Sequence, residues 1–129
     1  MILVDTNVLL DIFQNDPKWA GRSQEQLDAA STTDRLVINP VIYSELSIAF
    51  ARIEELEAVL TEATLTVESI PREALFLAGK AFLAYRGAKH SVLPGFYIGA
   101  HAAVMQCPLL TRDVARYRSY FSGISLICP

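Results

Sequence analysis

The sequence has little cysteine, no long apolar run and no excess of basic residues. Two cysteines in 129 residues cannot hold together a small disulfide-dependent fold. No apolar stretch approaches the roughly 20 residues that span a bilayer. The opening Met-Ile-Leu-Val-Asp also lacks the basic start and apolar run of a secretory signal. We therefore expect a cytoplasmic protein without a membrane segment.

The charge balance excludes a protein that binds nucleic acid through a basic field over its whole surface. Eleven Lys and Arg stand against fourteen Asp and Glu, giving a net charge of −3. A basic field over the whole surface is thus absent, and any binding of nucleic acid has to use a local patch or a metal ion.

The chain has enough apolar material for one folded domain spanning residues 1–129. Its apolar fraction of 52% excludes intrinsic disorder, and no repeat, low-complexity tract or Gly/Ser linker divides it. Short apolar runs alternate with helical patterns, which predicts an α/β fold with a parallel sheet covered on both faces. Both cysteines, Cys107 and Cys128, lie beside apolar runs and are expected to be small buried side chains.

The expected strands and helices follow from apolar spacing and from helix-start signals such as Asp16-Pro17 and Asn39-Pro40. The strands are 1–4, 36–38, 65–70, 108–111 and 124–127. The helices are 8–13, 17–30, 40–50, 53–63, 71 to the glycine at 87, 94–106 and a turn at 113–117.

Three carboxylates stand where a site in such a sheet is expected. Asp5 follows the first strand, Glu45 lies in the helix after the second, and Asp113 follows the strand at 108–111. Ligands of open parallel sheets gather outside the carboxyl ends of the strands. Like charges held close together repel, so a cluster of acids indicates a cation site, and oxygen ligands favour Mg²⁺ or Mn²⁺.

Each acid also has a purely structural interpretation. Asp5 and Asp113 could cap the helices that follow them, and Glu45 could be a solvated helix residue. A phosphoacceptor receiver domain and an Asp-x-Asp phosphatase would both place a second acid just after Asp5. Thr6 and Asn7 stand there instead, so both of these classes fit poorly.

Four segments together resemble a known family. They are the opening Ile-Leu-Val-Asp-Thr-Asn, the pair Ser44-Glu45, the segment from Leu93 to Ala102, and the run Leu110-Thr111-Arg112-Asp113. They resemble the PIN domain and, more narrowly, the VapC-type toxins of bacterial type II toxin–antitoxin pairs. The resemblance implies a three-layer α/β/α fold around a central parallel sheet, a homodimer, a Mg²⁺- or Mn²⁺-dependent ribonuclease activity and a cognate antitoxin. It also implies that Asp5, Glu45 and Asp113 are the catalytic residues and bind the metal. Thr6 and Asn7 are expected to lie on the supporting loop and to contact the substrate.

One position departs from the family pattern. Where the family carries an aspartate after its Leu-Pro, this chain has Gly95. A missing carboxylate removes a ligand and about one unit of negative charge from the cation site. We expect a weak or inactive ribonuclease that Gly95→Asp would activate, or alternatively a catalytically dead binding module that still binds an antitoxin and RNA.

Basic and apolar residues complete the expectations. Arg112 is the first choice for a contact with a substrate phosphate because it adjoins Asp113, whereas His101 is expected to pack. The other basic candidates near the site are Lys80, Arg86, Lys89, His90, Arg116 and Arg118. The apolar side chains of 41–50 exceed the needs of one small core, which indicates a dimer or antitoxin surface there.

Overall fold

The computed structural model describes residues 1–85, 87 and 92–129. Its strands are β1 (Ile2–Val4), β2 (Leu36–Ile38), β3 (Thr66–Val67), β4 (Leu109–Leu110) and β5 (Leu126–Ile127). They form one sheet in the order β3-β2-β1-β4-β5, and every neighbouring pair is parallel. The expected parallel sheet and α/β class are confirmed.

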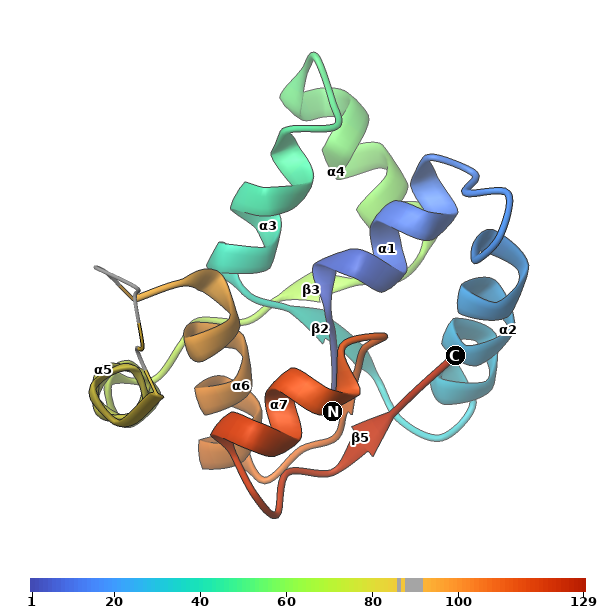
Figure 1. The fold of residues 1–129 in the computed structure, drawn as a ribbon. Coiled ribbons are helices and arrows are strands. Elements are labelled where there is room, and N and C mark those ends of the chain that lie inside the picture. Colours follow the sequence, from blue (N-terminus) through green and yellow to red (C-terminus); the bar gives the residue numbers. More distant parts are fainter. Residues whose placement is uncertain (86, 88–91) are drawn as a thin grey trace.

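Helices lie on both sides of this sheet. They are α1 (Thr6–Phe13), α2 (Ala20–Ser31), α3 (Pro40–Ser47), α4 (Ile53–Glu62), α5 (Arg72–Tyr85), α6 (Pro94–Met105) and α7 (Val114–Tyr120). Figure 1 shows α1 and α2 on one side of β1 and α5 and α6 on the other, which makes the three expected layers. Among the described residues, no helix is both long enough and apolar enough to cross a membrane.

Local sequence explains how the chain leaves its two central strands. β1 and β2 are entirely apolar and buried, as strands covered on both faces must be. The Asp5 side chain accepts a hydrogen bond from the Thr6 amide and so starts α1 directly after β1. Asn39 accepts the Ile42 amide, with proline in the first turn of α3. Both helices therefore begin at the carboxyl edge of the sheet.

Several boundaries differ from those expected. The first helix begins at Thr6 instead of at residue 8. α2 begins at Ala20 because the Asp16 carboxylate accepts the amides of Lys18 and Trp19 in a turn, so Asp16-Pro17 starts that turn and not the helix.

The other differences are mostly shortenings. The helix expected to reach residue 50 ends at Ser47, and the strand expected over 65–70 is only Thr66–Val67. α7 instead extends to Tyr120. Cys107 is buried as expected, but Cys128 is exposed, so the expectation for Cys128 is wrong.

The close packing of α6 against α7 depends on a glycine. A Cβ atom added to Gly99 would overlap the Phe121 ring and meet Tyr117. The missing side chain lets the two segments approach, and this brings α7 next to the carboxyl end of β1.

Three of the basic residues singled out in the sequence, Arg86, Lys89 and His90, lie outside the described residues.

Candidate active site

A pocket of about 340 Å³ opens at the carboxyl edge of the sheet. Four helices and the end of β1 contribute its walls. The polar side chains and the glycine that line it are Asp5, Thr6, Asn7, Glu45, Gly95, Arg116 and Tyr117. The sequence thus predicted correctly that Asp5, Glu45 and Gly95 border the same polar hollow.

Asp5 lies at the bottom of this pocket and is almost fully buried, with 5% of its surface exposed. One carboxylate oxygen accepts the Thr6 amide at 2.7 Å. The other accepts the hydroxyls of Thr111 at 2.7 Å and Tyr117 at 3.0 Å. Four donors, including the Asn7 amide described below, therefore hold the carboxylate in one orientation.

Burial also sets the protonation behaviour of this carboxyl. Removal from water raises the pKa of Asp5 above its ordinary value, although the hydrogen bonds from Thr111, Tyr117 and Thr6 oppose the rise. The nearby charge of Glu45 adds a smaller increase. Burial and the Asp5 charge likewise raise the pKa of the Tyr117 hydroxyl, so it stays a donor.

Glu45 approaches from α3 and is linked to Asp5 through one residue. The Thr6 hydroxyl donates to Glu45 Oε1 at 2.6 Å, and the Thr6 amide donates to Asp5. Thr6 therefore spaces two carboxylates that would otherwise repel each other freely. This gives Thr6 a positioning role on the supporting loop.

Asn7 connects the ends of β1 and β4. Its amide nitrogen donates to Asp5 Oδ2 at 3.3 Å and to Thr111 Oγ1 at 3.4 Å. Its oxygen accepts the Arg112 backbone amide at 3.2 Å. Asn7 thus orients the acid and fixes the loop after β4 while also lining the pocket.

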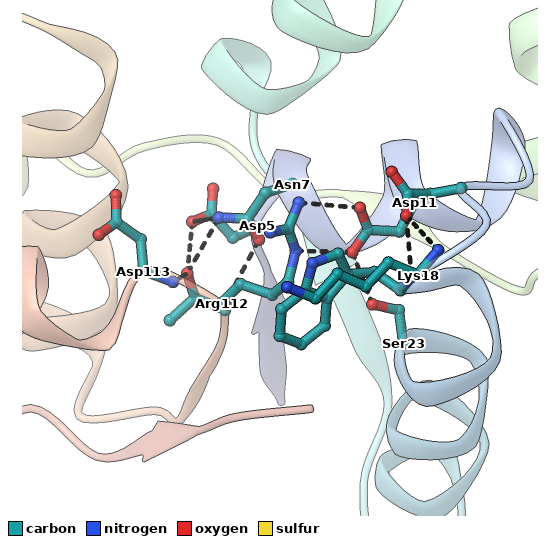
Figure 2. A network of polar contacts seen from close by, with 10 residues as sticks. Asp5, Asn7, Asp11, Lys18, Ser23, Arg112 and Asp113 are labelled. Atoms are coloured by element: carbon teal, nitrogen blue, oxygen red, sulfur yellow. Dashed lines mark hydrogen bonds and ion pairs between the residues drawn. The ribbon is translucent and has the colours of Figure 1, made fainter.

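Arg112 is engaged inside the protein instead of facing the pocket. Its guanidinium makes two hydrogen bonds to Asp11, at 2.8 and 2.9 Å, and lies 4.7 Å from the centre of the Trp19 ring. Asp11 is itself buried and accepts the Ser23 hydroxyl at 2.7 Å. Figure 2 shows Arg112 reaching from the Asp5–Asn7 group to Asp11. These contacts favour a structural role for Arg112 over the expected phosphate contact.

Asp113 is placed differently from the other two acids. Its side chain does not line the pocket, and its carboxylate pairs with Arg116 Nε at 3.0 Å. Asp5 and Glu45 therefore share the pocket lining, and the role of Asp113 as a third ligand stays a prediction. Within the described part of the chain, no group of three or more His, Cys, Asp or Glu side chains is arranged to hold a metal ion.

Comparison with known proteins decides the family. The family model of the PIN domain matches residues 2–120. The chain belongs to the PIN domain family. No curated protein sequence matches this PIN domain closely enough to add an activity.

Solved structures show the same fold. VapBC2 from Rickettsia felis, bound to a DNA fragment from its promoter, is 15% identical over 100% of this chain and 99% of that chain, with a TM-score of 0.76. VapBC-1 from nontypeable Haemophilus influenzae is 21% identical over 99% and 98%, with a TM-score of 0.71. FitAcB from Neisseria gonorrhoeae is 16% identical over 98% and 96%, with a TM-score of 0.68. The chain therefore spans nearly the whole length of these solved chains.

Gly95 lies in the first turn of α6, on the wall of the pocket. A Cβ atom built there would be 3.3 Å from Cδ and 3.6 Å from Nη1 of Arg116. The space next to Gly95 is therefore bordered by an arginine side chain. This PIN domain has a cation beside the position at which the resemblance places an aspartate.

The donors in the pocket fit a divalent cation of the Mg²⁺ type whose remaining coordination positions are filled by water or substrate. Asp5 and Glu45 supply hard carboxylate oxygens from one pocket. Mg²⁺ in enzymes is commonly held by one or two carboxylates together with waters and substrate phosphates. Two carboxylates meet that minimum, whereas a closed all-protein cage would need more ligands than this pocket offers.

Two residues of the site were missed in the sequence, and one other behaves as expected. Thr111 and Tyr117 both donate to Asp5, although Thr111 satisfies the same criterion that identified Asp5, a polar residue directly after a strand. His101 is buried, bonds to the Asn39 side chain and has a pKa lowered by burial. It packs in the core, as expected.

Proposed function

We propose that this PIN domain is the toxin of a toxin–antitoxin pair and acts as a ribonuclease dependent on Mg²⁺ or Mn²⁺. The observation that carries the proposal is the pair of carboxylates, Asp5 and Glu45, that Thr6 holds in one pocket at the carboxyl edge of the sheet. Full-length likeness to VapBC and FitAB structures supports the assignment to this group. A toxin of this type acts in the cytoplasm, where its RNA substrate is found.

The residues of the chain would divide the work as follows. Asp5 and Glu45 would hold the metal ion, which when bound activates a water and neutralises charge on the scissile phosphate. Thr6 keeps the two carboxylates apart and oriented, and Asn7, Thr111 and Tyr117 keep Asp5 in place. Asp113, whose Oδ2 pairs with Arg116, would be the third ligand.

The proposed partners are a cognate antitoxin and a second copy of the chain. Ile48, just after α3, is 87% exposed, and Ile53 at the start of α4 is 64% exposed. A second hollow of about 220 Å³ runs beside Ile48 and shares Thr6 and Glu45 with the pocket. A partner that covers Ile48 would therefore lie next to the carboxylates, as expected for a dimer with two sites in a shared groove.

The proposal is tested by incubating the purified chain with a mixed pool of RNA in Mn²⁺, and in parallel with a chelator. We expect cleavage products that appear with Mn²⁺ and disappear with the chelator. Expression of the gene should slow the growth of cells, and co-expression of its cognate antitoxin should restore growth. Chelator-resistant cleavage would contradict the metal-dependent activity.

A second candidate is a binding module without catalysis, and one observation favours it. Of the four acidic positions implied by the resemblance, one is Gly95 and another, Asp113, is paired with Arg116. Comparison of the natural chain with Gly95→Asp separates the two functions. Activity that is weak in the natural chain and rises with Asp at 95 supports the toxin, whereas two inactive proteins that bind RNA and antitoxin support the module.

A further inference from the structure

We propose that Arg116 binds a phosphate of the RNA substrate at the pocket and that Gly95 leaves the room in which Arg116 does so. The inference rests on the proposed ribonuclease function and goes beyond it by naming the group that recognises the RNA backbone. Sequence reasoning had placed this role on Arg112, whose guanidinium is instead held by Asp11.

Arg116 is in the right place for this role. It is on α7, lines the same pocket as Asp5 and Glu45, and passes close over Gly95 on α6. Any side chain at position 95 would begin 3.3 Å from Arg116 Cδ, so the arginine would have to shift by a few tenths of an ångström to admit it. The glycine therefore shapes one wall of the pocket around the arginine.

Arg116 is also oriented and still has free donors. Its Nε forms an ion pair with Asp113, three residues earlier in the chain, at 3.0 Å, which draws one edge of the guanidinium toward that carboxylate. Among the described residues, its terminal amino groups have no protein partner, and 54% of the side chain is exposed. An arginine held by one edge can offer its other N–H groups to a phosphate, the geometry in which arginine binds phosphates most strongly.

The charge of the pocket requires such a group. Asp5 and Glu45 place two negative charges in it, and the chain as a whole carries −3. An RNA backbone would be repelled by these charges unless a cation of the protein lies beside them. Arg116 is the cationic side chain that borders the pocket within the described residues.

The test measures binding of a short fluorescent single-stranded RNA in a chelating buffer, so that cleavage plays no part. Four proteins are compared at several salt concentrations: the natural chain, Arg116→Ala, Arg116→Lys and Arg118→Ala. Arg118 is an exposed arginine on the same helix and supplies a matched control for charge. Circular dichroism and melting temperature establish that each variant is folded.

We expect Arg116→Ala to weaken RNA binding about tenfold or more. The slope of log affinity against log salt should also become shallower by about 0.7, the value for one phosphate contact on a single strand. Arg116→Lys should retain the slope and part of the affinity, and Arg118→Ala should resemble the natural chain. A merely structural Arg116 would leave the salt slope unchanged.

Two results would overturn the inference and are distinguishable from each other. If the natural chain binds RNA and Arg116→Ala matches Arg118→Ala in affinity and slope, Arg116 is not the phosphate contact, while the ribonuclease proposal stands. If the natural chain binds no RNA in chelator and cleaves none in Mn²⁺, the proposed function fails together with the inference.

Discussion

At the scale of the residue, the site depends on one buried carboxylate. Asp5 receives donors from its own loop, from the end of β4 and from α7. It is the point at which segments far apart in the sequence meet. A protein optimised for stability alone would not bury a charge there, because removing a carboxylate from water is costly. Buried Asp11 is paired with Arg112, whereas the four donors to Asp5 are all uncharged, so the buried charge of Asp5 indicates a functional role.

The pKa of Asp5 gives a prediction for Asp5→Asn. Burial raises this pKa above 3.8 in the folded chain, so the folded state binds the proton more readily than the unfolded state. The ionised carboxyl thus destabilises the fold at neutral pH, and the effect fades as pH falls through the raised pKa towards 3.8. We expect Asp5→Asn to be more stable than the natural chain at pH 7. Urea unfolding between pH 3.5 and 8 measures this difference.

The opposite result would have a clear meaning. If Asp5→Asn were less stable at pH 7 and the deficit persisted at low pH, the four hydrogen bonds would outweigh the burial of the charge. Glu55→Gln on the exposed side of α4 is the matched control and should change stability little at any pH.

The sequence predicted those site residues whose position follows from the backbone alone. Asp5, Glu45 and Gly95 were identified because each follows a strand or opens a helix at the edge of the sheet. The partners of Arg112 and Asp113 could not be predicted, because the direction of their side chains depends on Asp11 and Arg116. Adjacency along the chain does not reveal such partners.

At the scale of the element, the ends of helices and strands decide the geometry. Asn39-Pro40 predicted the start of α3 correctly, and Pro94 that of α6. Asp16-Pro17 has the same pattern but forms a turn, because the Asp16 carboxylate accepts hydrogen bonds from the backbone amides of Lys18 and Trp19. Local sequence indicates that a cap exists, but the packing around it decides whether a helix follows at once.

The pair of Arg112 and Asp11 ties the loop after β4 to α1 and α2, which yields a prediction for Arg112→Ala. The change leaves the Asp11 carboxylate, 4% exposed, without its cation. We expect a loss of about 2–4 kcal/mol in the free energy of unfolding, below the usual range for fully buried pairs because Arg112 is 30% exposed. Chemical denaturation measures the loss.

An exposed ion pair provides the control for this prediction. Arg35 and Glu68 also pair closely, at 2.6 Å, but Arg35 is 58% exposed. Arg35→Ala should cost no more than about 1 kcal/mol. Equal losses for Arg112→Ala and Arg35→Ala would show that the contact with Asp11 does not anchor the loop.

At the scale of the whole molecule, several large apolar side chains are exposed to solvent. Ile42 and Leu46 of α3 are buried in the core, so most of the apolar excess noted in 41–50 serves the monomer. Ile48 and Ile53 remain exposed, as do Phe76 and Leu83 on α5. Exposed apolar groups of this size are typical of surfaces that bind a partner.

Ile48 supplies the prediction for assembly. If the natural chain dimerises through the end of α3, sedimentation at micromolar concentration should give twice its mass of 14.2 kDa. Ile48→Asp should shift it to the monomer, because the new charge would be buried in the interface. Phe76→Asp on α5, equally apolar and 70% exposed, should leave the dimer intact. A natural chain that sediments as a monomer would contradict the dimer.

The most direct test of the proposed activity is the rate of RNA cleavage in Mn²⁺ by the natural chain, Glu45→Gln and Glu55→Gln. Glu45 lines the pocket with Asp5, whereas Glu55 is an exposed acid on α4. The account predicts that Glu45→Gln reduces the rate by about 10²-fold or more, while Glu55→Gln cleaves like the natural chain. Cleavage by Glu45→Gln at the natural rate would show that the pocket of Asp5 and Glu45 is not the active site.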